Sequence, residues 1–144
     1  MIRLGQWFRS RRRSQRGSAT IFMLGFATVL MVGAGIVIDG GLALNKRSQL
    51  TDDTEQAARS AANAIDIPYL RSTGVVQVDP AQASAVGSGF LAERGYTDIS
   101  VSVNGNEVTA SAQSTVDTAI LSLIGINTFT IRGQATAVPQ IGIG

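Results

Sequence analysis

Residues 19–38 form an uninterrupted run of twenty residues without a charged side chain, ATIFMLGFATVLMVGAGIVI, and ten of them are Ile, Leu, Val or Phe. As an α-helix with a rise of 1.5 Å per residue, this run is about 30 Å long, which matches the hydrocarbon core of a bilayer. The core helix of a soluble domain is normally shorter and has a polar stripe. The sequence therefore predicts a transmembrane helix over residues 19–38.

The charges on either side of this run predict its orientation. Residues 1–18 contain six Arg and no acidic residue, whereas residues 19–144 contain six basic and ten acidic residues, a net charge of −4. Because basic flanks stay in the cytoplasm, we predict a basic cytoplasmic tail over residues 1–18 and an extracytoplasmic part from residue 39 onwards. This orientation explains the Arg cluster without nucleic acid, and its topology determinants are Arg11, Arg12, Arg13 and Arg16.

A cleaved secretory signal is the competing interpretation of the N-terminus. Secretory signals have an apolar region of about 7–15 residues followed by a small-residue cleavage site. The apolar run here is longer, and no A-x-A sequence follows it. The sequence therefore favours an uncleaved anchor.

Residues 39–66 are rich in Ala, lack Pro and precede Pro68. We predict that they extend the helix beyond the bilayer, giving a rod over residues 19–66 that is about 72 Å long, with a kink allowed at Gly40-Gly41. Asp39 is expected at the water boundary rather than buried. The small and apolar residues that share helical faces are candidates for packing against a neighbouring helix, although Gly and Thr are also common in spanning helices: Gly25, Thr28, Gly35, Ala43, Leu50, Ala57, Ala61 and Ala64.

Residues 67–144 predict a small extracytoplasmic α+β domain. Asp79-Pro80 and Gly95 bound a short helix, residues 117–125 suggest a second one closed by Gly125, and residues 128–138 alternate as a last strand. Asn104-Gly105 predicts a type I′ hairpin that pairs residue 103 with 106 and 101 with 108. Its core face then holds Ile99, Val101, Val108 and Ala110.

The fold class that we predict is α+β. A long N-terminal helix, membrane-spanning and extended beyond the bilayer, is followed by a small domain with one or two short helices and a roughly three-stranded, mainly antiparallel sheet. A domain of this size buries only about 60% of the surface of its unfolded chain. We therefore expect it to lean on the rod or on another subunit.

The sequence offers little catalytic chemistry, because it contains no Cys and no His. Asp52, Asp53 and Glu55 are expected on a solvated helix surface, with Arg59 paired to Glu55. Four further acids near element boundaries have capping as their expected role: Asp66, Asp79, Asp98 and Asp117. We predict no enzymatic activity, no catalytic or metal-binding residue, no cofactor, no small-molecule substrate and no nucleic-acid partner.

The order of these features resembles the TadE/TadG-like Flp (Tad) pilus-assembly proteins, particularly the actinobacterial type, over residues 16–138. The resemblance is carried by the segments RGSAT, IVIDGG and LALNKRSQLTDDTEQAARSAANAI, and by the closing strand TIRGQATAVP. It implies a non-enzymatic pilin-like or anchoring subunit whose partners are the lipid bilayer and other pilus-assembly or pilin subunits. TadE-type prepilins have Glu five residues after the processed Gly, where this chain has Phe22 after Gly17. The chain is therefore expected to resemble the uncleaved TadG-like type.

Two functions follow from these features. The first is a single-pass membrane component of a Tad pilus assembly system, possessing a rod and an extracytoplasmic domain that associate laterally with other subunits. The second is a membrane-anchored extracytoplasmic module that binds a cell-wall polymer or an exported protein.

Overall fold

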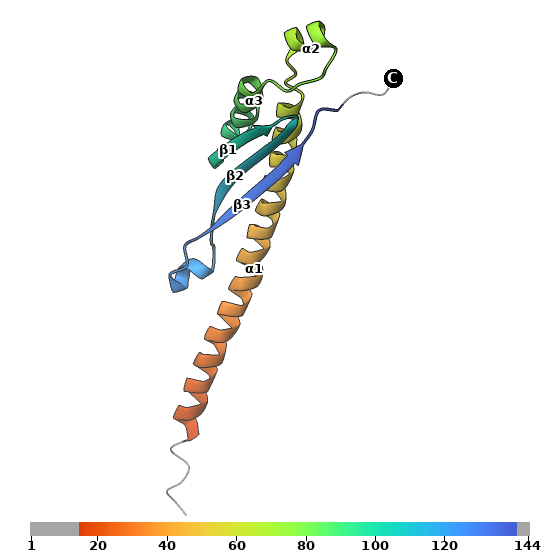
Figure 1. Cartoon of the computed structure of the whole chain (residues 1–144). Coiled ribbons are helices and arrows are strands. Elements are labelled where there is room, and N and C mark those ends of the chain that lie inside the picture. The colour runs from red at the N-terminus through yellow and green to blue at the C-terminus, as the bar shows by residue number, and fades with distance from the viewer. Residues whose placement is uncertain (1–14, 141–144) are drawn as a thin grey trace, which may run out of the picture.

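The computed structural model describes residues 15–140, in which a long helix carries a small domain along its upper half (Figure 1). The helix, α1 (Gln15–Ala62), has 48 residues and is followed by α2 (Ile67–Thr73), α3 (Pro80–Glu93), β1 (Thr97–Asn104), β2 (Glu107–Asp117), the 3-10 helix η1 (Leu121–Ile124) and β3 (Thr128–Ala137). We call residues 63–140 the head. The predicted α+β class, with a long N-terminal helix and a three-stranded antiparallel sheet, is confirmed.

The long helix differs from the prediction in where it ends. It runs without interruption through Gly40 and Gly41 but ends at Ala62, four residues before the predicted end at residue 66. Pro68, expected only to stop the rod, lies instead in the first turn of α2, an element that the sequence analysis missed. The Asp66 carboxylate accepts a hydrogen bond from the Tyr69 N–H at 2.9 Å, so Asp66 and Pro68 together start a new helix.

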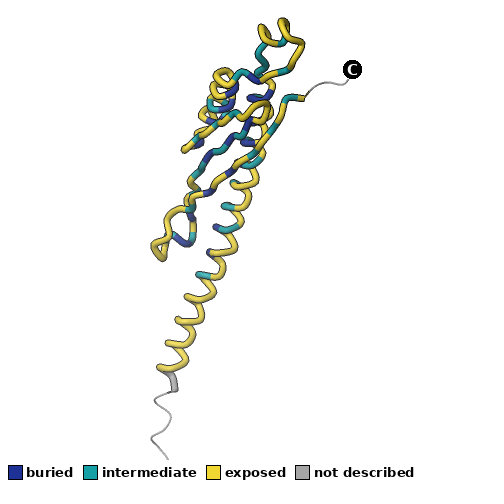
Figure 2. Tube along the Cα trace, in the orientation of Figure 1, coloured by how far each residue is buried: buried dark blue, intermediate teal, exposed yellow. Residues whose placement is uncertain are grey.

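The three strands lie in the order β1-β2-β3, and the inner face of the sheet packs against α1 and α3. Side chains on this face are small, which lets the layers approach closely. Figure 2 shows the buried residues concentrated between the sheet and the upper part of α1. The buried core consists mainly of Leu50, Ala57, Ala58, Ala61, Ala62, Val78, Ala83, Leu91, Val108, Ala110, Ala112 and Ile131.

Two glycines mark the closest approaches in this core. A Cβ atom added to Gly133 of β3 would lie 2.8 Å from Leu50 Cγ, so only Gly fits between the strand and α1. A Cβ atom added to Gly87 of α3 would lie 3.1 Å from Val101 Cγ2 and 3.3 Å from Ala61 Cβ. The head is therefore fitted to the surface of α1 rather than tethered to its end.

The hairpin forms, but its predicted register is wrong. Asn104 pairs with Glu107 and Val103 with Val108, so the turn residues are Gly105 and Asn106. Gly105 has a φ of +63° and Asn106 has no positive φ, which fits a type II′ turn rather than type I′. The Asn106 side chain also fixes the turn to a neighbouring segment, because it accepts a hydrogen bond from the Val78 N–H and donates one to the Val76 carbonyl.

The register error leaves the predicted core face unchanged. Moving the turn by one residue shifts the pairing by two positions, and two positions return each side chain to the same face of the strand. Val101 is opposite Ala110, and Val108 and Ala110 are buried. Ile99 also packs against the core, beyond a bulge between Thr97 and Ser100.

Asp53 joins α1 to the head, whereas the sequence analysis placed it on a solvated surface. Its carboxylate accepts a hydrogen bond from the Tyr96 hydroxyl at 2.6 Å and lies 3.1 Å from the Arg94 Nε. Burial first, and then the Asp53 carboxylate, raise the pKa of Tyr96 to about 12. The neighbouring pair expected from sequence is present, with Arg59 2.7 Å from Glu55.

The remaining acids at element boundaries have mixed roles. Asp79 caps α3 as predicted, accepting from the N–H groups of Ala81 and Gln82. Asp98 lies inside β1, where it accepts a hydrogen bond from the Gln113 side chain rather than capping a helix. Asp117 is the exposed last residue of β2.

Candidate membrane and assembly surfaces

The lower part of α1, residues 17–38, is almost entirely uncovered (Figure 2). Large apolar side chains on this segment are exposed to an extent that a water-facing helix rarely shows, with Phe22 at 74% and Met23 at 75%. Among the residues that the structure describes, α1 is the one helix long and apolar enough to cross a membrane. This segment therefore has the surface of a membrane anchor.

The upper part of α1, residues 39–62, begins with a buried carboxylate. Asp39 is 1% exposed, and its oxygens accept hydrogen bonds from three consecutive backbone N–H groups of the β2–β3 connection. The donors are Ala119 at 2.9 Å, Ile120 at 3.0 Å and Leu121 at 2.7 Å. The expectation that Asp39 stays at a wet boundary, unburied, is wrong, because the first turn of η1 folds over it.

The comparisons with known proteins bear on this same helix. The family model of TadE/G-like Flp pilus-assembly proteins, Tad, matches residues 17–64. We call residues 17–64 the Tad segment, after the family model to which they are similar. They include nearly all of α1 and comprise 48 of the 144 residues, fewer than the predicted resemblance over residues 16–138. No curated protein and no solved structure matches the chain.

The match supports involvement in Flp pilus assembly and agrees with the family suggested by the sequence. It does not separate an actinobacterial type from others. Within the Tad segment, Asp39 is held by the β2–β3 connection, residues 40–49 stay mostly exposed with Leu42 and Leu44 among them, and full burial under the head begins at Leu50. The candidate helix-packing residues therefore fall into two groups.

Candidates in the upper Tad segment pack against the chain itself. Leu50, Ala57 and Ala61 are fully buried beneath the sheet and α3. Ala43 and Ala64 are half-buried. The face that the sequence suggested for a neighbouring subunit is, at these positions, occupied by the head.

Candidates in the lower Tad segment differ among themselves. Gly25 is exposed, and a Cβ atom added to it would meet nothing within 4 Å. Thr28 is exposed as well, and its hydroxyl donates to the Leu24 carbonyl at 2.9 Å. Gly35 is buried, because Ile120 and Leu121 of the β2–β3 connection lie against it. Gly25 thus remains open to a partner, whereas Thr28 is exposed at the edge of a narrow crevice whose other side is lined by residues of the β2–β3 connection.

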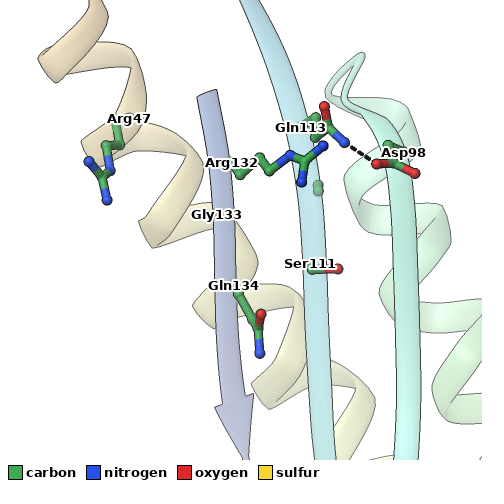
Figure 3. A pocket seen from close by; sticks show the side chains of 8 residues that line it. Arg47, Asp98, Ser111, Gln113, Arg132, Gly133 and Gln134 are labelled. Carbon is green, nitrogen blue, oxygen red and sulfur yellow. Dashed lines mark hydrogen bonds between the residues drawn. The ribbon is translucent and has the colours of Figure 1, made fainter. Parts of the chain in front are cut away.

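The outer face of the sheet carries a shallow polar groove of about 380 Å³ (Figure 3). Arg132 and Gln134 of β3 project beside Ser111 and Gln113 of β2, with Arg47 of α1 at its margin. Asp98, the one acid that lines it, already accepts the hydrogen bond from Gln113. The groove therefore brings cationic and amide side chains together, but it does not contain the pair of carboxylates that acid–base catalysis would use.

The remaining predicted residues lie outside what can be described. Arg11, Arg12 and Arg13 precede the described residues, and Arg16 lies in α1 with its side chain outside them. Within residues 15–140, His, Cys, Asp and Glu side chains form no cluster that could hold a metal ion.

Proposed function

We propose that this chain is a non-enzymatic, single-pass membrane component of a Tad pilus assembly system, acting as a minor pilin-like or anchoring subunit. The lower Tad segment crosses the membrane over residues 19–38, residues 1–18 remain cytoplasmic, and the head is extracytoplasmic. The observation that carries this proposal is the change of surface along α1, which passes from exposed Phe, Ile, Val and Leu over residues 21–38 to Leu50, Ala57 and Ala61 buried by the head.

The structure supports different roles for the two parts of α1, the upper part packing against the head and the lower part facing the membrane. Five residues of the upper α1 form a common core with the head, so the head cannot swing freely on a linker above the membrane: Leu50, Ala57, Ala58, Ala61 and Ala62. Lateral association with another Tad subunit then uses the surface of the lower α1 that the β2–β3 connection leaves open, which includes Gly25. Small residues on such a face let two helices approach closely in lipid.

A deletion strain tests the role in piliation. Deleting the gene is expected to impair assembly of Flp pili, observed by electron microscopy, and the full-length chain is expected to restore it. Wild-type pili in the deletion strain would reject the proposal.

A pair of variants then tests the open face. Gly25→Leu places a bulky side chain on it, and Ala34→Leu makes a similar change on the opposite side of the helix. We expect Gly25→Leu to lose piliation and Ala34→Leu to retain it, with both proteins present in the membrane. Equal piliation in the two strains would exclude a helix contact through Gly25. Ala57→Leu is unsuitable here, because Ala57 is buried inside the head.

The polar groove favours a second function, an anchored module that binds a wall polymer or an exported protein. Arg132 and Gln134 lie on an uncovered sheet face and can offer hydrogen bonds to such a ligand. Replacing residues 19–38 with an unrelated spanning helix separates the two functions. A binding module keeps its activity after this exchange, whereas an assembly subunit that uses the Gly25 face loses it.

A further inference from the structure

The connection between β2 and β3 does not stay with the sheet but descends along α1. Its 3-10 helix lies beside α1, just beyond the lower ends of the strands (Figure 1). Ile120, Leu121, Leu123 and Ile124 face Thr28, Met31 and Val32 of α1 across a narrow apolar crevice. We call residues 120–126 the apolar tip.

The apolar tip reaches positions that the sequence assigns to the transmembrane run. Thr28, Met31, Val32 and Gly35 lie four to eleven residues before Asp39. At 1.5 Å per residue these positions are about 6–16 Å nearer the middle of the run than Asp39. Half of a hydrocarbon core is about 15 Å thick, so a bilayer that encloses residues 19–38 also encloses the level of the tip.

The chemistry of the tip suits lipid better than water. Residues 118–131 contain no charged side chain. Leu123, Ile124 and Ile126 are 69%, 54% and 43% exposed. Their exposed surface continues the bare apolar surface of the lower α1.

Non-helical backbone can enter a leaflet only if its polar groups find partners within the protein. The Asp39 carboxylate accepts the N–H groups of Ala119, Ile120 and Leu121. Carbonyl groups of the same connection accept four more, those of Thr118, Leu123, Gly125 and Ile126. Seven backbone N–H groups between Thr118 and Ile126 thus have hydrogen-bond partners inside the protein and do not need water.

We propose that the apolar tip inserts into the head-side leaflet of the membrane, where Leu123, Ile124 and Ile126 contact lipid acyl chains. Asp39 then lowers the cost of insertion, because its carboxylate accepts the hydrogen bonds of backbone N–H groups at the start of η1 that would otherwise face lipid without a partner. The chain then contacts lipid through two elements, the spanning helix and the apolar tip beside it, and together they fix the tilt and rotation of the head. This inference rests on the proposed insertion of residues 19–38.

The absence of Cys from the chain allows a clean test with single-cysteine variants of the full-length protein. Leu123→Cys labels the tip, Val29→Cys labels the lower α1, and Val75→Cys labels an exposed apolar position in the head beyond α2. Each variant carries an environment-sensitive fluorophore and is reconstituted in vesicles of phosphatidylcholine and phosphatidylglycerol. Spin-labelled acyl chains report contact with lipid, and iodide reports contact with water.

We expect the fluorophores at positions 29 and 123 to be quenched by spin-labelled lipid roughly twofold or more over that at position 75, which iodide alone quenches. Iodide quenching at 123 equal to that at 75, with 29 protected, would overturn the inference and leave the anchor intact. Iodide quenching at 29 would overturn the anchor itself. Protection at 123 without lipid quenching, and dependent on protein density, would assign the tip to a second copy of the chain and also overturn the inference.

Discussion

The two halves of α1 are built from one uninterrupted helix, yet they present different surfaces. Below Asp39 the side chains are large and apolar and face outward, as Phe22 and Val37 do at 74% exposure. Above Asp39 the helix still exposes Leu42 and Leu44, but from Leu50 onwards its outer side is polar and its inner side has Leu50, Ala57 and Ala61 buried at 0% exposure. Helical periodicity is the same in both halves.

The contrast between the two halves shows that an apolar helix surface is a core surface where the chain itself buries it, and a candidate membrane surface where the chain leaves it exposed. From Leu50 onwards, the sheet and α3 cover the apolar side chains of the upper half, and Asp52, Glu55 and Arg59 on its outer side face water. The lower half has no such cover beyond the apolar tip, so the partner for its side chains has to come from outside the chain. Each prediction below tests one half against the other.

The largest effect is expected in the upper half, from Leu50→Ala. Leu50 fills the space against Gly133, so its truncation leaves a cavity between α1 and β3. We expect the free energy of unfolding of the head to fall by about 2–5 kcal/mol, measured by denaturant titration of the full chain in detergent micelles. Leu44→Ala, at a position that is 68% exposed, serves as the control and should change it by less than about 0.5 kcal/mol. Equal losses would mean that the head does not depend on this contact.

The lower half should respond to charge instead. Leu30 is 57% exposed, so Leu30→Asp disturbs no contact inside the chain but places a carboxylate near the middle of the bilayer. We expect a loss of insertion of about 3 kcal/mol, seen as protein released from membranes by alkaline extraction, with unfolding of the head unchanged. Leu44→Asp makes the same exchange above Asp39 and should leave extraction unaffected. If both variants stay in the membrane, the boundary at Asp39 is misplaced.

Asp39→Asn tests the junction between the halves. An amide has one acceptor oxygen in place of two, and it lacks the charge that strengthens the bonds from Ala119, Ile120 and Leu121. We expect hydrogen exchange at these three amides to accelerate by about tenfold or more, while amides of β2 and β3 are unchanged. Asp117→Asn, an exposed position near the same connection, is the control. Unchanged exchange in Asp39→Asn would show that the carboxylate does not hold the connection.

The sequence was sufficient for features that depend on neighbouring residues. The apolar run, the Asp79 cap and the core face of the hairpin follow from local patterns, and the face survived the register error because it repeats every two residues. The turn type did not follow, since Asn106 is held by Val76 and Val78, which are about 30 residues away in the chain.

The features that the sequence missed all depend on distant contacts. Asp39 accepts hydrogen bonds from backbone N–H groups some 80 residues further along the chain. Because almost every residue type has a backbone N–H group, the sequence does not reveal which of them form this contact. Asp53 finds Tyr96 and Arg94 only after α3 has packed on α1. The missed α2 is an exception, because Asp66, Pro68 and Gly74 form a recognisable start and stop around a short helix.

The smallest effect concerns the contact that holds α3 and β1 to the upper half. Tyr96 is one of two tyrosines, so Tyr69→Phe leaves its titration alone in the ultraviolet spectrum. Because the folded-state pKa is raised from 10.0 to about 12, the stabilisation is complete below pH 10 and is lost as pH rises towards 12. Adding Asp53→Asn removes the negative charge at 2.6 Å and should lower the pKa of Tyr96 while leaving it above 10.0, since burial is the larger cause. A pKa that stays at about 12 in this variant would show that α1 is not electrostatically coupled to the head at Asp53, and a value of 10.0 would show that Tyr96 is not buried against it.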